Sequence, residues 1–71
     1  MESLSLAESL PLEIKRVKEI VEIYRKPELK GVGEFAAKMM EVDIKKAEQA
    51  NIEQDTVEMI KSYYVLKEYT V

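Results

Sequence analysis

Apolar residues recur every three or four positions over most of the chain, which is the spacing of one face of an α-helix rather than of a β-strand. The first such segment predicts a helix from Pro11 to about Arg25 with Ser9 as its N-cap, because proline is tolerated in the first turn of a helix. Residues 1–9 carry only a weak pattern and are expected to form an N-terminal arm. The apolar seam of this first helix has heptad-like spacing and comprises Leu10, Ile14, Val17, Val21 and Tyr24.

A second helix is predicted over about Glu34–Ala50, with Asn51 as a left-handed C-cap. The connection that precedes it covers about Lys26–Gly33, because Pro27 is disfavoured inside a helix and restricts the residue before it. Its two glycines permit positive φ angles, which suit a tight turn into the second helix. One face of the second helix is apolar and comprises Val32, Ala36, Met39, Met40, Ala47 and Ala50, with Phe35 and Ile44 on its flanks.

A third helix is predicted over about Thr56–Glu68, because Asp55 and Glu58 have the spacing of a capping box. Two apolar stripes run along this helix. One comprises Met59, Ile60, Tyr63 and Leu66, and the other comprises Val57, Ile60 and Tyr64. A three-helix monomer needs only one buried face per helix, so the second stripe predicts a surface on which copies of the chain associate.

The predicted fold is therefore all-α, with one helical domain over residues 10–71 that consists of a long helical hairpin and a third helix. A chain of 71 residues has a small core, and its apolar burial at ~25 cal/mol/Å² roughly offsets an ordering cost of ~1.5 kcal/mol per residue. The chain has no cysteine, so disulfides cannot add stability. We expect a helical homo-oligomer, because association is the remaining common way to stabilise so small a domain.

Composition removes several classes of function. The chain has no histidine and no cysteine, which excludes a catalytic triad, a thiol nucleophile, an imidazole base and a structural zinc site of the usual kind. We therefore expect a protein that is not an enzyme and that uses no metal or cofactor. A net charge of −3 argues against binding to DNA or RNA backbones. The longest uncharged runs, such as Ser62–Leu66, have five residues, far from the ~20 apolar residues that cross a membrane.

Charge is nevertheless uneven, and one segment has a basic excess. Residues 11–30 hold six Lys and Arg against four Glu, a balance of +2. This segment leads through Gly31 and Gly33 into the second helix, whose free N–H groups together with nearby cations would suit a phosphate. A solvated basic loop with a glycine-assisted turn is the alternative interpretation, because Gly-x-Gly alone is a weak motif.

Three aromatic residues are candidates for stacking on a nucleobase: Tyr24, Phe35 and Tyr63. Tyr24 directly precedes two cations, an arrangement that suits a nucleotide, although both tyrosines could instead be core residues at helix ends. Glu13 and Arg16 are three residues apart on the first helix, so they could face a ligand together or form an ordinary exposed ion pair.

Asp43 is the most unusual residue of the pattern, because it falls near the middle of the apolar face of the second helix. A buried carboxylate needs a partner, for which the Tyr63 hydroxyl, Arg16 or a ligand amine are candidates. We predict that Asp43 is more than half buried and hydrogen-bonded. A contact with a ligand, or an exposed position at the edge of the face, are the alternatives.

Several segments of the chain resemble a family of small tailed-phage proteins that act as anti-CBASS nucleotide sponges. The resemblance covers about residues 10–68 and rests on Leu10–Val17, Gly33–Met40, Ala47–Ala50, Asp55–Ile60 and Tyr63. Proteins of this family often have a glycine in the turn before the third helix, whereas Asn51–Asp55 contains none here.

The resemblance implies that the chain assembles as a small helical homo-oligomer, a tetramer or alternatively a dimer, in the cytoplasm of an infected bacterial host. It also implies that the protein sequesters a cyclic dinucleotide resembling 3′3′-cyclic GMP–AMP without cleaving it, and so inhibits defence signalling. On this hypothesis, Arg16 and Lys26 contact phosphate together with the N–H groups of Gly31 and Gly33. Glu13 contacts a purine edge, and the bases stack on Tyr24, Phe35 and Tyr63.

A function of another class is also compatible with the sequence. A small helical phage protein can inhibit a host protein, or act as an adaptor for it, by presenting an apolar helix face. A minor phage structural or DNA-associated protein is a third hypothesis.

Overall fold

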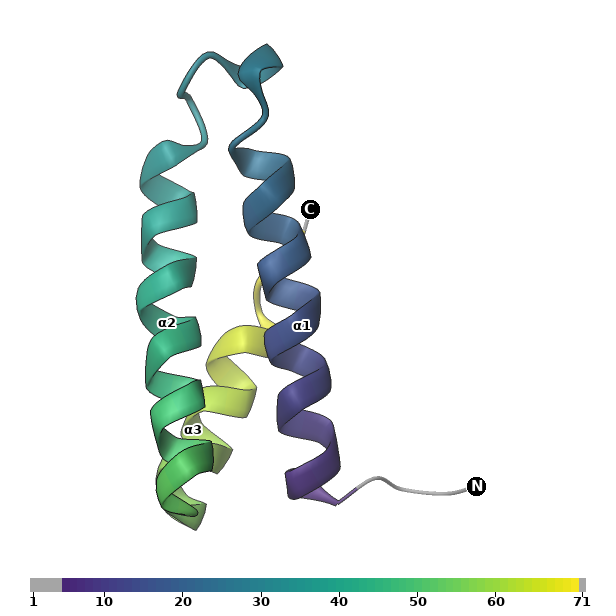
Figure 1. The fold of residues 1–71 in the computed structure, drawn as a ribbon, viewed down its shortest axis with the longest axis vertical. Helices are drawn as coiled ribbons and strands as arrows, with labels where there is room; N and C mark the ends of the chain where they lie inside the picture. Colours follow the sequence, from purple (N-terminus) through teal and green to yellow (C-terminus); the bar gives the residue numbers. More distant parts are fainter. Residues whose placement is uncertain (1–4, 71) are drawn as a thin grey trace.

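The computed structural model describes residues 5–70, and its regular elements are three α-helices and a short 3₁₀ turn. The α-helices are α1 (Leu6–Tyr24), α2 (Glu34–Glu53) and α3 (Thr56–Lys67), and the turn is η1 (Pro27–Leu29). Helices α1 and α2 lie side by side and run in opposite directions, while α3 packs across both of them at the end where α2 finishes (Figure 1). The all-α prediction is confirmed for the described part of the chain, which contains no strand.

Helix α1 begins five residues earlier than predicted, because its N-cap is Ser5 rather than Ser9. The Ser5 hydroxyl accepts a hydrogen bond from the Glu8 N–H at 3.3 Å, and the Glu8 carboxylate accepts one from the Ser5 N–H at 3.0 Å. This reciprocal capping box satisfies two terminal donors, and its hydrogen bonds lower the pKa of Glu8. Pro11 consequently lies inside the helix. Residues 1–4 of the predicted arm lie outside the described residues.

The connection between α1 and α2 contains both glycines, and each is used for a different reason. Helix α1 ends at Tyr24, one residue before the predicted end. Gly31 has a φ of +82°, as predicted. The prediction is wrong for Gly33, whose φ is −86°. Glycine is needed at position 33 because a Cβ atom there would overlap the carbonyl oxygen of Tyr24, so only glycine allows α2 to begin this close to α1.

Helix α2 continues three residues past its predicted end, to Glu53. Its C-cap is Gln54 rather than Asn51, and Gln54 has a φ of 55°. A left-handed conformation at this position is one that glycine adopts without strain. The turn before α3 thus has a backbone conformation that favours glycine, although glutamine occupies the position.

The buried face of α2 is rotated from the predicted one. Ala37 and Ile44 belong to the core, whereas Met39 is about half exposed and Val32 is 85% exposed. Val32 precedes the first residue of α2, so helical periodicity does not apply to it. Five residues of α2 are buried against α1 and α3: Ala37, Met40, Ile44, Ala47 and Ala50.

Helix α3 begins as predicted, with the Asp55 side chain accepting a hydrogen bond from the Glu58 N–H. It places Met59 and Leu66 in the core, where they meet five buried residues of α1. The second predicted stripe lies on the surface of the single chain: Val57, Ile60 and Tyr64 are exposed. The contribution of α1 to the core comprises Leu10, Ile14, Val17, Ile20 and Val21.

Candidate functional site

The residues predicted to bind a ligand fall into separate groups in the fold. Tyr24, Lys26, Gly31, Gly33 and Phe35 all lie at the end of the molecule that carries the connection between α1 and α2 (Figure 1). The other three residues lie away from this end. Glu13 and Arg16 pair in the middle of α1, while Tyr63 lies on α3 and lines a shallow pocket with Leu6, Ser9, Thr56, Ile60 and Tyr64.

The connection end carries both an exposed aromatic ring and exposed cations. Phe35 is 76% exposed at the start of α2, and Lys26 and Lys30 are exposed in the connection. Tyr24 is half-buried, and its hydroxyl donates a hydrogen bond to the carbonyl oxygen of Thr70 at 3.2 Å. The Phe35 ring is therefore accessible to a ligand in the single chain, whereas Tyr24 also has a structural role.

Arg25 reduces the basic excess of this end through a contact that the sequence analysis did not identify. Its Nη2 atom lies 3.0 Å from Glu34 and 2.9 Å from Glu41, two carboxylates of α2. The hydrogen bonds that Arg25 donates to Glu41 and Glu34 raise the pKa of Arg25, and the hydrogen bond from the Arg25 guanidinium lowers the pKa of Glu41. Because Glu34 occupies the first turn of α2, a carboxylate of the chain itself already lies at that helix N-terminus.

Arg16 holds the carboxyl end of α3. Its Nη1 and Nη2 atoms donate to the carbonyl oxygens of Tyr69 and Leu66 at 2.8 and 2.9 Å, and its Nε donates to the Glu13 carboxylate at 2.9 Å. The predicted pairing of Glu13 with Arg16 is thus confirmed. A positive charge beside free carbonyl groups at a helix C-terminus is also favourable to the helix dipole. The predicted contact of Arg16 with phosphate remains a prediction, and it would have to coexist with these three hydrogen bonds.

Asp43 is more than half buried and hydrogen-bonded, as predicted, but its partner is Tyr69. The Tyr69 hydroxyl donates to Asp43 Oδ2 at 2.6 Å. Burial, followed by this hydrogen bond to a carboxylate, raises the pKa of Tyr69 to about 12. The candidate partners Tyr63 and Arg16 were wrong, because Tyr69 follows the last residue of α3 and its position relative to α2 depends on how α3 packs.

We expect Asp43→Ala to lower the free energy of unfolding by about 1–3 kcal/mol, because it leaves the half-buried Tyr69 hydroxyl without its acceptor. Tyr69→Phe removes the donor, and the double variant should lose less than the sum of the two single losses. Urea unfolding followed by circular dichroism measures all three. Additive losses would contradict a direct interaction.

The Asp43–Tyr69 hydrogen bond predicts that the free energy of unfolding depends on pH. The folded pKa of Tyr69 exceeds its ordinary value of 10, so the stability it contributes is present below pH 10 and is lost as the pH rises towards about 12.

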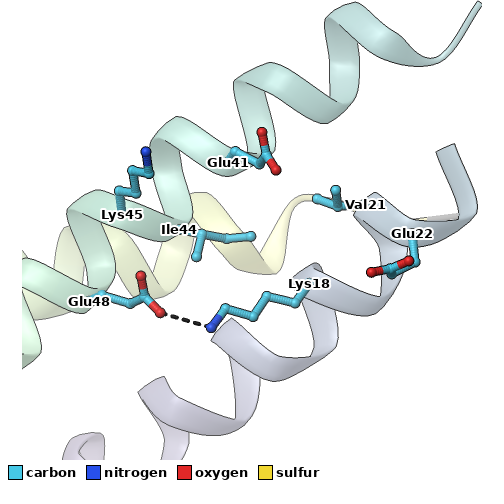
Figure 2. Close-up of a pocket in the computed structure, with 7 residues that line it drawn as sticks. All are labelled: Lys18, Val21, Glu22, Glu41, Ile44, Lys45 and Glu48. Carbon is cyan, nitrogen blue, oxygen red and sulfur yellow. Dashed lines mark ion pairs between the residues drawn. The ribbon is translucent and has the colours of Figure 1, made fainter. Parts of the chain in front are cut away.

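An open groove of about 350 Å³ lies between α1 and α2. Figure 2 shows Lys18 of α1 reaching across it to Glu48 of α2, and the two groups form an ion pair at 2.8 Å. The floor contains Val21 and Ile44, and charges of both signs surround it. None of the predicted ligand residues lines this groove. Two lysines and three glutamates line the groove, so it has no excess of positive charge that would favour an anion.

Comparisons with models of protein families, with curated proteins and with solved structures found no match. Among residues 5–70, no helix combines the length and the apolar character that a membrane span requires. The same residues contain no group of three or more metal-binding side chains. Hypotheses about function therefore depend on the surface chemistry of the three helices and on the resemblance described above.

Proposed function

We propose that the protein is a homo-oligomeric binding protein that sequesters a cyclic dinucleotide of the 3′3′-cyclic GMP–AMP type, without catalysis, and thereby inhibits CBASS signalling in an infected bacterium. The observation that carries the proposal is that the exposed ring of Phe35 and the exposed side chains of Lys26 and Lys30 lie at the same end of the molecule. An accessible aromatic face and nearby cations are what a base and its phosphate require. The choice of a cyclic dinucleotide comes from the family resemblance.

Self-association is part of this proposal because a ligand with two bases and two phosphates needs two sets of contacts. Phe35 is largely exposed in the single chain, so a base stacked on it would need a second surface to enclose it. A second copy provides the same ring and the same cations by symmetry. We propose a tetramer, with a dimer as the alternative, and sedimentation measures the mass. A stable monomer at micromolar concentration would contradict the assembly.

We expect Phe35→Ala and Lys26→Ala each to weaken binding of 3′3′-cyclic GMP–AMP about 10- to 100-fold, because a stacked base is worth about 1–3 kcal/mol and a charged hydrogen bond a similar amount. Calorimetric titration measures the affinity. Ile52→Ala is a matched control for Phe35, since Ile52 is equally exposed at the other end of α2. Lys61→Ala, on α3, is the control for Lys26.

The fate of the ligand separates sequestration from cleavage. The dinucleotide recovered after heat denaturation should be intact, and a linear product would show that the protein is a nuclease. Unchanged affinity in Phe35→Ala and Lys26→Ala would place the ligand elsewhere. If no cyclic dinucleotide binds the wild-type chain, the alternative becomes a protein that binds a host protein through an apolar helix face. The exposed stripe of Val57, Ile60 and Tyr64 favours this alternative.

A further inference from the structure

Helix α2 has an apolar seam on its surface in addition to its buried face. Phe35, Met39 and Val42 are 76, 48 and 53% exposed, and they follow one another at intervals of four and three residues. This is the spacing of the d, a and d positions of a heptad repeat, which pack against a second helix in a coiled coil. We call these three residues the α2 seam.

We propose that a second copy of the chain docks on the α2 seam, with the two α2 helices packed side by side in parallel orientation. This inference rests on the self-association that forms part of the proposed function, and it adds which surface associates and in which direction. A two-fold axis parallel to the helices would place each seam residue beside the same residue of the other copy.

One pair of charges that flank the seam favours the parallel orientation, against the like-charged pair that Lys46 at the next heptad position forms with its own copy. Lys38 occupies a g position and Asp43 the following e position of the heptads defined by the seam. In a parallel pair, each g residue lies beside the e residue five positions later in the other helix, so Lys38 of each copy meets Asp43 of the other. In an antiparallel pair, the two copies of Lys38 would face each other across the seam. The hydrogen bond from Tyr69 uses Asp43 Oδ2, and a carboxylate can accept several further hydrogen bonds.

The seam is short, so the association it supports is weak. From Phe35 to Val42 it extends about 10 Å along the helix axis, and the next heptad position is Lys46, whose long side chain can place its charge in solvent. Three side chains bury less than the about 800 Å² per partner of a standard interface. We therefore expect a dimer that dissociates on dilution through the micromolar range, and that other surfaces are needed for a tetramer.

Parallel docking has a consequence for the connection end. The two copies of Lys26 and Lys30 lie at the same end of the dimer, where the two copies of Phe35 form the last pair of the seam and only the side of that pair that faces this end is left for a ligand. Like charges repel there, so a ligand with two negative charges should strengthen the dimer by bridging them.

Single-cysteine variants test the proposal cleanly because the natural chain has no cysteine. In a parallel pair, Val42→Cys brings two identical positions together, and a disulfide needs Cα atoms about 4.4–6.8 Å apart. We expect Val42→Cys to form a disulfide-linked dimer on mild oxidation at least about tenfold faster than Ile52→Cys, which is more exposed but lies off the seam. In an antiparallel pair, the two copies of residue 42 would be separated by about 10 Å along the axis.

Each outcome of the oxidation experiment decides the proposal. Rapid linkage of Val42→Cys alone supports it. Preferential linkage between Phe35→Cys and Val42→Cys in a mixture would overturn the parallel orientation. An oligomer in sedimentation without linkage at residue 42 would overturn the α2 seam as its interface, and a monomer at all concentrations would overturn the association itself. Titration of unmodified protein with cyclic dinucleotide is independent of these results, so a failed interface and a failed ligand hypothesis remain distinguishable.

Discussion

Truncation of Leu66 to alanine should lower the free energy of unfolding by about 2–5 kcal/mol, the range found for leucine truncations in protein cores. Leu66 is fully buried, and it is part of the core that joins α3 to α1 and α2. At 0.05–0.15 kcal/mol per residue, a 71-residue domain has a total stability of only about 4–11 kcal/mol. The variant is therefore expected to lose a large part of the total stability of the domain. Urea titration followed by circular dichroism measures the loss.

Ile60→Ala is the matched control for Leu66→Ala on the same helix. Ile60 is 43% exposed, and its truncation should cost about 1 kcal/mol or less in a dilute sample that contains monomers. If Ile60→Ala and Leu66→Ala lose equal stability under those conditions, α3 packs through a different face from the one described. A loss for Ile60→Ala that appears only at high protein concentration would instead indicate that this side of α3 takes part in self-association.

Helix content was predictable from the sequence because each helix contains a regular apolar pattern, but some boundaries depended on competing local signals. Three serines, at positions 3, 5 and 9, precede the pattern of α1, and the preference of Pro11 for the first turn favoured Ser9 as the N-cap. Only Ser5 has a glutamate three residues later, so only Ser5 can form the reciprocal capping box. The Ser-x-x-Glu signal was present in the sequence and was a better guide than the proline.

The burial of Asp43 was also predictable, whereas its partner was not. A carboxylate within an apolar pattern must find a donor, which is a local requirement. The choice of Tyr69 as donor depends on how α3 crosses α2, and nothing in the local sequence of either helix determines that angle. The same reason explains Arg16, whose carbonyl partners are 50 and 53 residues away in the chain.

The candidate ligand residues show a further limit of sequence analysis. Periodicity places a residue on a face of its own helix, but it does not determine which helices meet. Tyr63 therefore lies away from the connection end, although its residue type suited a stacking role. Lys26, Gly31, Gly33 and Phe35 lie at one end of the molecule because one short segment of chain contains them all; their contact with a ligand stays a prediction.

Replacement of Arg16 by alanine has the second-largest expected effect, a loss of about 2–3 kcal/mol of stability. Three hydrogen bonds from a charged donor disappear, and the carbonyl groups of Leu66 and Tyr69 lose a partner at the end of α3. The side chain is 37% exposed, so water replaces part of what is lost and the effect stays below the sum of three charged hydrogen bonds. Urea unfolding of dilute protein measures it.

Arg25→Ala is the matched control for Arg16→Ala, because the Arg25 side chain also starts from the α1 end and is similarly exposed, but it contacts only two half-exposed carboxylates of α2 and bonds no backbone group of α3. Its replacement should cost clearly less stability.

The comparison also separates the two roles assigned to Arg16. If Arg16 has only a structural role, we expect Arg16→Ala to be destabilised. We also expect this variant to recover its binding of a cyclic dinucleotide when low temperature restores the folded fraction. A phosphate contact predicts weaker binding of the fully folded variant, by about tenfold or more. Stability equal to wild type would show that Arg16 does not anchor α3, whatever the ligand does.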